Sequence, residues 1–425
     1  MTTPPTWRSS TWGDEVSLEY GKALRDYSES GGSVRVFGTN GPVGWTDTPL
    51  AEGPGVILGR KGAYRGVHYS VDAFWVIDTA YFVVPKADCD MRWLYYAITH
   101  HKLGEINDGS PIPSTTRAAV YPRELAVPPI ETQRAIAAVL GSLDDKIEQN
   151  RRTARALERL ARAIFRAWFV DFEPVKAKAA GAASFPSMPQ PVFDALPTTF
   201  TDSEMGPVPE EWRLGTLGEL GTLAIGGDWG KDEPFDGAVQ AYCLRGVDLE
   251  HLRSTGQATP PLRWMKPTSI DRRTMNERDV LVAGSGAGPT GRPLWACPGF
   301  MRTDTPVIYS NFCKRIRCSS AAAAVYLDAW LHQMRESGEI WEHVNGTSVP
   351  NLDAKSMLAG KTVVIPPEPL LQTYYTLVRP MWEHLFCGEN HTLAALRDYL
   401  LPQLLSGQVP VEVGDAERVA TKGSA

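Results

Sequence analysis

The sequence lacks three features that would place it in a familiar class. No run of about 18 apolar residues occurs, so we expect no membrane-spanning helix. The first twelve residues are polar and contain prolines, unlike a secretory signal, and we expect a cytoplasmic protein. The cysteines form no Cys-x-x-Cys pair, and their spacing fits neither a zinc site nor a disulfide framework, so we expect reduced thiols and no metal. They are Cys89, Cys243, Cys297, Cys313, Cys318 and Cys387.

A strong excess of positive charge is also absent. The net charge is −6, and even the most basic segment, 130–178, has only ten basic residues against seven acidic ones. Phosphate neutralisation supplies most of the affinity of a DNA-binding protein. If this chain binds DNA, it therefore does so through local patches and with modest affinity, and a partner supplies further basic surface. The 425 residues, 43% of them hydrophobic, allow two or three globular domains.

What the sequence does contain is an internal repeat. The motif Asn107–Pro113 in the first half resembles Asn345–Pro350 in the second. Each is followed by an apolar run that ends in a double proline, Pro128-Pro129 or Pro366-Pro367, and then by a long helical pattern. These matches in the same order predict a duplication. We therefore predict an α+β fold in which two mixed α/β domains form a pseudo-two-fold repeat.

The first long helix is the clearest local pattern. From Thr132 to Phe172 it would be about 60 Å long, and its apolar residues recur at alternating steps of four and three, which predicts a seam against another helix. The seam is Ile136, Leu140, Leu143, Ile147, Asn150, Ala154, Leu157, Ala161, Ile164 and Trp168. Asn150 either fixes the register of the helix pair or reaches solvent. The outer face is basic, and it is either a solvated surface or one that faces phosphates or a partner; its residues are Arg151, Arg152, Arg155, Arg159, Arg162 and Arg166.

The second long helix spans Leu370 to Leu405 and is less regular. Pro380 should kink or split it, and Gly388 should weaken it further. We expect it to pack antiparallel on the first helix through Leu393, Leu396 and Leu400, as a coiled-coil-like ruler that separates the two domains. The predicted segments are a first domain at 1–129, the first helix at 130–173, an irregular linker at 174–211, a second domain at 212–367, the second helix at 368–407 and a flexible tail at 408–425.

No catalytic constellation is evident. The sequence contains no His-Glu-x-x-His, Gly-x-Ser-x-Gly or Walker lysine motif. The stretch Asp279–Gly288 resembles the cofactor loop of S-adenosylmethionine methyltransferases, but Pro289 follows at once, where that fold needs a helix. The Asp/Asn-Pro-Pro-Tyr/Phe motif of DNA amino-methyltransferases is also missing. We therefore predict a chain that is not an enzyme and holds no cofactor.

Glycine-rich loops that follow predicted strands are the candidate DNA contacts. Glycines let a backbone approach DNA closely, and Arg, Lys and short polar groups bind phosphates or base edges. The alternative for each loop is plain turn chemistry. The candidate residues are Arg60, Lys61, Tyr64, Arg65, Asn107 and Ser110 in the first half, and Ser285, Thr290, Arg292, Asn345, Thr347 and Ser348 in the second.

The layout resembles the specificity subunits of type I restriction–modification systems. The stretches that carry the resemblance are Val127–Pro129, Ile147–Arg152, Ala163–Val175, Gly206–Trp212, Gly346–Leu352 and Leu400–Gly407. The resemblance implies two target-recognition domains, each reading half of a split site in double-stranded DNA. It also implies two methyltransferase subunits that bring S-adenosylmethionine, and restriction subunits that bring ATP and magnesium. The first domain departs from the pattern, because it is short and its Gly109–Pro113 loop lacks the Asn-Leu that follows in the second half.

Three other functions stay open at this point. The chain could be a stand-alone DNA-binding regulator with two reading domains, a scaffold without a DNA role, or the methyltransferase disfavoured above. Methylation that needs a separate subunit would distinguish the specificity subunit from the regulator and the enzyme. Failure to bind DNA even with partners would leave the scaffold.

Overall fold

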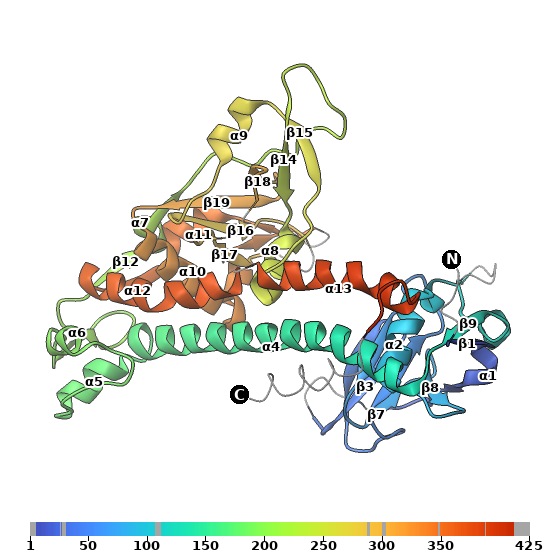
Figure 1. Ribbon diagram of the computed structural model, residues 1–425. Helices are drawn as coiled ribbons and strands as arrows, with labels where there is room; N and C mark the ends of the chain where they lie inside the picture. Colours follow the sequence, from blue (N-terminus) through green and yellow to red (C-terminus); the bar gives the residue numbers. More distant parts are fainter. Residues whose placement is uncertain are drawn as a thin grey trace. The chain divides into compact units, whose positions relative to one another are not determined.

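The computed structural model (Figure 1) describes residues 6–25, 27, 31–106, 112–286, 290–299, 303–346, 349–386 and 388–411. The chain forms two compact units. Unit 1 comprises Met1–Ile147 and Thr392–Ala425, and unit 2 comprises Glu148–His391. The division therefore falls inside both long helices rather than at the ends of the globular domains.

Unit 1 contains a four-stranded antiparallel sheet in the order β2-β8-β5-β6, a three-stranded sheet β4-β3-β7 and the pair β1-β9. Helix α2 begins where Asp90 accepts a hydrogen bond from Trp93 N (2.8 Å), and its buried face packs on β5 and β6. The elements are β1 Arg8–Thr11, α1 Trp12–Glu15, β2 Val16–Tyr20, β3 Val34–Gly38, β4 Gly41–Thr46, β5 Gly55–Gly59, β6 Val67–Ser70, β7 Phe74–Val76, β8 Ala80–Pro85, α2 Met91–His100, η1 Leu103–Glu105, α3 Arg117–Val120 and β9 Glu124–Val127.

Unit 2 contains sheets of the same kind: four strands in the order β13-β19-β16-β17, three in the order β15-β14-β18, and the pair β12-β22. Helix α10 packs on β16 and β17, and Ser320 caps its start. The elements are β12 Arg213–Thr216, α7 Leu217–Leu220, β13 Gly221–Leu223, β14 Val239–Leu244, α8 Gly246–Thr255, β15 Leu262–Met265, α9 Pro267–Arg273, β16 Asp279–Ala283, β17 Pro293–Trp295, β18 Val307–Tyr309, β19 Cys313–Cys318, α10 Ala321–Ser337, η2 Glu339–His343, β20 Val344–Asn345, β21 Asn351–Leu352, α11 Ala354–Gly360 and β22 Thr362–Ile365.

The pairings in the four-stranded sheet, the three-stranded sheet and the pair β1-β9 or β12-β22 correspond between the two units, while β20-β21 and β10-β11 have no counterpart among the described strands of unit 1. In each three-stranded sheet the central strand runs antiparallel to one neighbour and parallel to the other. In unit 1, β3 is antiparallel to β4 and parallel to β7, and in unit 2, β14 is antiparallel to β15 and parallel to β18. The helix that follows each four-stranded sheet, α2 or α10, covers the middle strand β5 or β16. Unit 2 differs by inserting α8 between β14 and β15, and α9 between β15 and β16.

Two long helical segments accompany these sheets. Helix α4, Ile130–Phe169, is 40 residues long, two residues longer than predicted at its start and three residues shorter at its end. It runs antiparallel to the second segment. In unit 2, Tyr374 Oη donates to Ala161 O (3.4 Å) and Asn150 Nδ2 donates to Glu389 Oε2 (2.8 Å). In unit 1, Leu404 shares a core cluster with Ile136 and Leu140.

The second segment is divided, but not at Pro380. Helix α12 spans Glu368–Leu385 and continues five residues beyond Pro380, and α13 spans Glu389–Leu405. Pro380 is exposed, so the carbonyl of Thr376 that it leaves without a helical donor lies on the solvent side. The division lies instead beside Gly388, whose φ of +75° favours glycine. Of the two predicted effects of Pro380, the split was therefore wrong, and the kink stays a prediction.

Asn150 is 7% exposed and donates a second hydrogen bond to Asn390 Oδ1 (3.0 Å), so the alternative that it reaches solvent was wrong. Most of the predicted seam is buried or half-buried: Ile136, Leu140, Leu143, Ile147, Ala154, Leu157, Ala161, Ile164, Trp168, Leu393 and Leu400. Leu396 was also predicted to lie in the seam, but it is 43% exposed, because α13 turns this side chain away from its core contacts.

The segment predicted as an irregular linker contains the helices α5, Glu173–Ala179, and α6, Gln190–Asp194. Each has a proline in its first turn, where the missing N–H costs no helical hydrogen bond. Val175 and Phe193 are buried in the core of unit 2 together with Trp168 and Phe169. The short strands β10, Phe200–Thr201, and β11, Val208–Pro209, follow. The prediction of irregular structure was wrong because these prolines begin helices instead of preventing them.

Candidate nucleic-acid interface

The two loops singled out in each half of the sequence are in contact. In unit 1 the β5–β6 loop contacts the loop that ends in Pro113, which we call the proline loop. Gly62 N donates to Pro113 O (3.1 Å), and Lys61 and Ser114 form an isolated antiparallel β-bridge. In unit 2 the β16–β17 loop meets its proline loop in the same way, with Gly286 N donating to Pro350 O (3.3 Å) and Ser285 bridging to Asn351. Each unit therefore presents a composite loop surface at the equivalent place of its fold.

In unit 1 most of the cationic groups of this surface are held internally. Arg60 donates to Asp78 O (2.9 Å), and its guanidinium lies 5.0 Å from the ring centroid of Tyr20. Arg65 donates to three backbone carbonyls, those of Gly62, Gly104 and Ile106. Lys61 is exposed and Tyr64 is 79% exposed. Of the four predicted residues in this loop, Lys61 and Tyr64 are the ones that face solvent fully.

In unit 2 the predicted residues divide in a similar way. Thr290 is fully buried and its hydroxyl donates to Gly286 O (2.6 Å), so it braces the loop and is not available to a ligand. Ser285 is half-buried, and Arg292 is half-buried beside Glu250. Asn345 is exposed at the end of β20, opposite Asn351. The predicted residues Asn107, Ser110, Thr347 and Ser348 lie outside the described residues.

A basic and aromatic hollow beside α9 was missed from the sequence. It has a volume of about 410 Å³, and the exposed cations Lys231, Lys266 and Arg272 line it together with Trp264 and Phe235. Cations interleaved with aromatic rings suit phosphates and bases. The signal was present as Trp229-Gly-Lys231, Trp264-Met-Lys266 and Arg272-Arg273, but these pieces are far apart in sequence and only the β14–β15 pairing and α9 bring them together.

One carboxylate, Asp228, belongs to this hollow and stays ionised. Burial by itself would raise the pKa of Asp228, but the hydrogen bonds from Ser269 Oγ and Gly230 N and the charge of Arg273 outweigh it, so the pKa lies below its ordinary value. Asp228 thereby holds the Gly230 turn and α9 together. The side of the hollow formed by Lys231, Lys266 and Arg272 is left as its cationic face.

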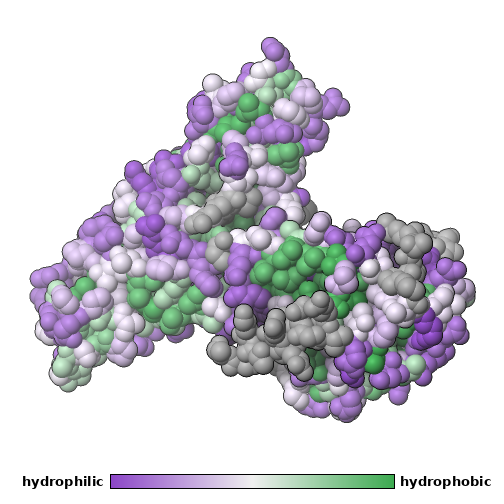
Figure 2. All heavy atoms as spheres, viewed as in Figure 1, coloured by the Kyte–Doolittle hydropathy of each residue, from purple (hydrophilic) through white to green (hydrophobic). Residues whose placement is uncertain are grey.

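Helix α13 carries an apolar surface within unit 1. Leu396 is 43% exposed and Tyr399 is 66% exposed. Figure 2 shows hydrophobic side chains gathered over this helix on the face in view. Exposed apolar side chains that cluster on one element are typical of a protein–protein contact.

In the part of the chain that the structure describes, no group of three or more His, Cys, Asp and Glu side chains could hold a metal ion. The five cysteines in the described ranges are free thiols, and burial raises the pKa of Cys89, Cys243, Cys313 and Cys318 to about 12. Cys387 lies outside these ranges. Among the described helices, none is both long and apolar enough to cross a membrane.

Comparison with known proteins gives a consistent result. No family model matches the chain. The chain is 31% identical to the type I restriction enzyme HindI specificity subunit of Haemophilus influenzae, over 82% of this chain and 84% of that protein. It is 25% identical to the type I restriction enzyme MjaIX specificity subunit of Methanocaldococcus jannaschii, over 78% of this chain and 72% of that protein.

The fold has a counterpart among solved structures. The S subunit of a type I restriction–modification system from M. genitalium superimposes with a TM-score of 0.56 and 14% identity, covering 94% of this chain and 96% of that one. At this identity the likeness concerns the fold. It extends over nearly the whole chain.

Proposed function

The chain belongs to the specificity subunits of type I restriction enzymes, and on that premise we propose that its two units each read one half of a bipartite DNA site. The observation that carries the proposal is the correspondence between the units. Both have the same strand orders in their four-stranded and three-stranded sheets, and both join a glycine-rich loop to a proline loop through two backbone hydrogen bonds. They are Gly62 N to Pro113 O and Thr115 N to Arg60 O in unit 1, and Gly286 N to Pro350 O and Leu352 N to Gly284 O in unit 2. Two equivalent surfaces in one chain suit two half-sites.

In this proposal the recognition domains are 1–129 and 212–367. Lys61 and Tyr64 serve the first half-site, and Ser285 and Asn345 serve the second, together with the α9 hollow. Arg292 contacts the DNA backbone beside the second half-site and reads no base. Arg60, Arg65 and Thr290 shape the loops, because their polar groups are bound to backbone carbonyls. Asn107, Ser110, Thr347 and Ser348 remain proposed contacts of the same two proline loops.

We further propose that α4, α12 and α13 act as a ruler that fixes the gap between the half-sites. Two reading surfaces on one rigid body meet the same face of a duplex when the half-site centres are about one turn, roughly 34–36 Å, apart. The antiparallel contacts at Asn150 and Tyr374 support a fixed register. Insertion of one heptad after Asn150 is expected to alter the gap or abolish activity. An unchanged recognition site would refute the ruler.

The chemistry itself is assigned to partner subunits. The chain would be a non-catalytic component that directs two adenine methyltransferase subunits, which bring S-adenosylmethionine, and restriction subunits, which bring ATP and magnesium. The exposed Leu396 and Tyr399 of α13 support a partner contact on that helix. The modest basic surface of the chain alone also fits a reader that binds DNA tightly only in the complex.

The test is to co-express the chain with its cognate methyltransferase and to map methylated adenines across the host DNA by single-molecule sequencing. We expect a two-part motif with a constant gap that disappears when this chain is deleted. A motif that persists after the deletion would contradict the proposal. DNA binding without any methylation would favour a regulator instead.

A further inference from the structure

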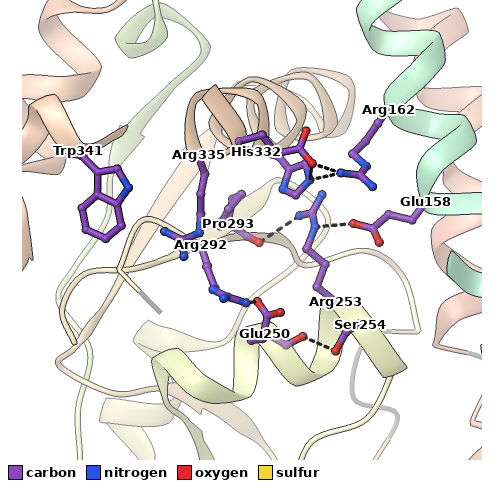
Figure 3. Close-up of a pocket in the computed structure, with 11 residues that line it drawn as sticks. Glu158, Arg162, Glu250, Arg253, Ser254, Arg292, Pro293, His332, Arg335 and Trp341 are labelled. Carbon is purple, nitrogen blue, oxygen red and sulfur yellow. Dashed lines mark hydrogen bonds and ion pairs between the residues drawn. The ribbon is translucent and has the colours of Figure 1, made fainter. Parts of the chain in front are cut away.

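A cleft lined by arginines lies between α4 and α10 in unit 2, and none of the roles above accounts for it. It consists of two adjoining hollows of about 370 Å³ each, which share Arg162 and Glu336. Six arginines against three glutamates leave a formal surplus of three positive charges. They are Arg159, Arg162, Arg166, Arg253, Arg292 and Arg335, against Glu158, Glu250 and Glu336. Figure 3 shows the first hollow, with Trp341 on one side and α4 on the other.

The floor of the cleft is a buried ion-pair network with a structural role. Arg253 of α8 donates to Glu158 of α4 (2.9 Å) and to Asp328 of α10 (3.2 Å), and its guanidinium lies 4.8 Å from the ring centroid of Trp382 in α12. Removal of one partner from such a buried network leaves an uncompensated charge. Arg253 therefore fastens α8 to three helices and is not available to a ligand.

The rim is different, because its carboxylates are open to solvent. Arg162 pairs with Glu336, whose side chain is 50% exposed, and Arg292 with Glu250, whose side chain is 42% exposed. Exposed ion pairs are worth about 0–1 kcal/mol, so a competing anion can displace these carboxylates at little cost. The rim arginines can thus change partner without loss of the fold.

His332 lies among these arginines and reports the positive field of the cleft. Burial and then the charges of Arg253, Arg162, Arg335 and Arg292 lower the pKa of His332 to about 2, so the imidazole is neutral. Its Nε2 lies 2.9 Å from Arg162 Nη1. Since arginine only donates, Nε2 accepts this bond and the ring proton is on Nδ1. The neutral ring orients Arg162 without adding charge.

We propose that this cleft binds backbone phosphates of the DNA, beside the bases that unit 2 reads. The inference rests on the proposed function. One wall of the cleft belongs to the β16–β17 recognition loop, since Arg292 ends that loop and Arg335 Nη1 donates to Thr290 O (2.6 Å). A duplex that meets the loop therefore brings its backbone to the rim. One guanidinium group can bind two phosphate oxygens at once, so Arg162 and Arg292 could each hold a phosphate.

The proposed contact carries no base information and acts through charge. The logarithm of the DNA-binding constant falls linearly with the logarithm of the salt concentration, and each phosphate that the protein neutralises adds about 0.9 to the magnitude of this slope. The Arg162→Gln/Arg292→Gln double variant, assembled with the methyltransferase, is therefore expected to lower that slope by about 1.8. When the salt concentration rises from 50 to 200 mM, the unsubstituted complex should lose roughly ten times more of its DNA affinity than the double variant.

Two further variants keep the result interpretable. Arg213→Gln removes one exposed arginine on β12 of the same unit, where Arg213 is paired with Glu219. This variant is expected to leave the slope unchanged. Arg162→Lys keeps the charge and is expected to keep most of the slope. A double variant that fails to assemble with the methyltransferase would instead assign the cleft to an acidic segment of that subunit and overturn the phosphate proposal.

The methylated motif separates this inference from the proposed function. If the double variant keeps the two-part motif and loses salt dependence, both stand. If the motif is present and the slope is unchanged, the phosphate site is wrong while the specificity role survives. If the unsubstituted complex methylates no two-part motif, the proposed function itself fails. Phosphate ethylation interference supplies an independent readout, because protection beside the half-site of unit 2 should disappear in the double variant alone.

Discussion

The globular domains of units 1 and 2 share one strand framework but differ in what has been inserted into it. In unit 1, β3 and β4 are joined by the short turn Thr39–Asn40, and β4 and β5 by residues 47–54. In unit 2, α8 and α9 occupy the corresponding places. Helix α8 supplies Arg253 and Glu250 to the arginine cleft, and α9 forms a wall of the basic hollow. The common strands thus position a recognition loop in both units, and the insertions give unit 2 additional cationic surface.

The comparison predicts that unit 2 depends on its insertions for stability. In the Arg253→Met variant, the buried Asp328 and the half-buried Glu158 lose their shared partner, at an expected cost of about 3–5 kcal/mol. Hydrogen exchange should accelerate in α8 and α10 and stay unchanged in α2 of unit 1. The exposed pair Arg213–Glu219 is the matched control, and Arg213→Met should cost no more than about 1 kcal/mol. Equal losses in the two variants would show that α8 is not fastened through Arg253.

Acid sensitivity is expected in both units, because burial also lowers the pKa of His68, His100 and His101 in unit 1, and unit 2 adds His332 with its surrounding arginines. The pKa of His332 is lowered to about 2, whereas an unfolded histidine titrates near 6.5. The unfolded state therefore binds the proton more readily, so the stability is fully present above pH 6.5 and is lost as the pH falls. The expected loss is about 1.4 kcal/mol for each pH unit between pH 6 and 4. The His332→Gln variant should lack this component in a denaturation series across that range. Parallel profiles for the two proteins would contradict the assignment.

The cations of the α9 hollow predict that unit 2 contributes more than unit 1 to the salt dependence of DNA binding. The triple variant Lys231→Gln/Lys266→Gln/Arg272→Gln removes three exposed cations and should lower the salt slope by up to about 2.7. In unit 1, Lys61→Gln removes one and should lower it by about 0.9. Salt titrations of the assembled complex measure both slopes. A larger effect of Lys61 than of the triple variant would reverse the proposed asymmetry between the units.

The smallest expected effect lies in the helices that the two units share. Asn150→Ala removes the hydrogen bonds to Glu389 and Asn390 and should cost about 1 kcal/mol. Thermal unfolding of the isolated chain measures this change. A more stable variant would mean that Asn150 is retained for register at a cost in stability.

Much of the fold was predictable because its signals are periodic or local. The steps of four and three along α4 predicted its length and its buried face, and the recurring proline motifs predicted a duplication. The contact between each glycine-rich loop and its proline loop was not predicted. Proline was interpreted less well. Pro380 does not split α12, and it lies on the solvent-exposed side of that helix. Pro174 and Pro191 begin helices, because the neighbouring Val175 and Phe193 are buried in the core of unit 2. That core is formed by residues far away in sequence.

The candidate site was predicted in position but only partly in its residues. Arg65 and Thr290 belong to the right loops, yet their polar groups bind backbone carbonyls that no sequence pattern identifies. The α9 hollow combines cations from several elements and has no contiguous signature. The arginine cleft has one in part, because Arg159, Arg162 and Arg166 belong to the basic face of α4 that the sequence showed, whereas its other arginines come from elsewhere in the fold. Local chemistry therefore indicates where a loop is, whereas tertiary packing decides which of its charges are available.

The central claim is that each unit reads its own half-site, and methylation mapping of two loop variants tests it most directly. One complex carries Lys61→Ala and Tyr64→Ala, and the other carries Asn345→Ala with Ser285→Ala. Each is expected to relax or lose the base preference of a different half of the motif while the gap stays constant. If both complexes change the same half, or if either changes the gap, the assignment of one half-site to each unit is contradicted.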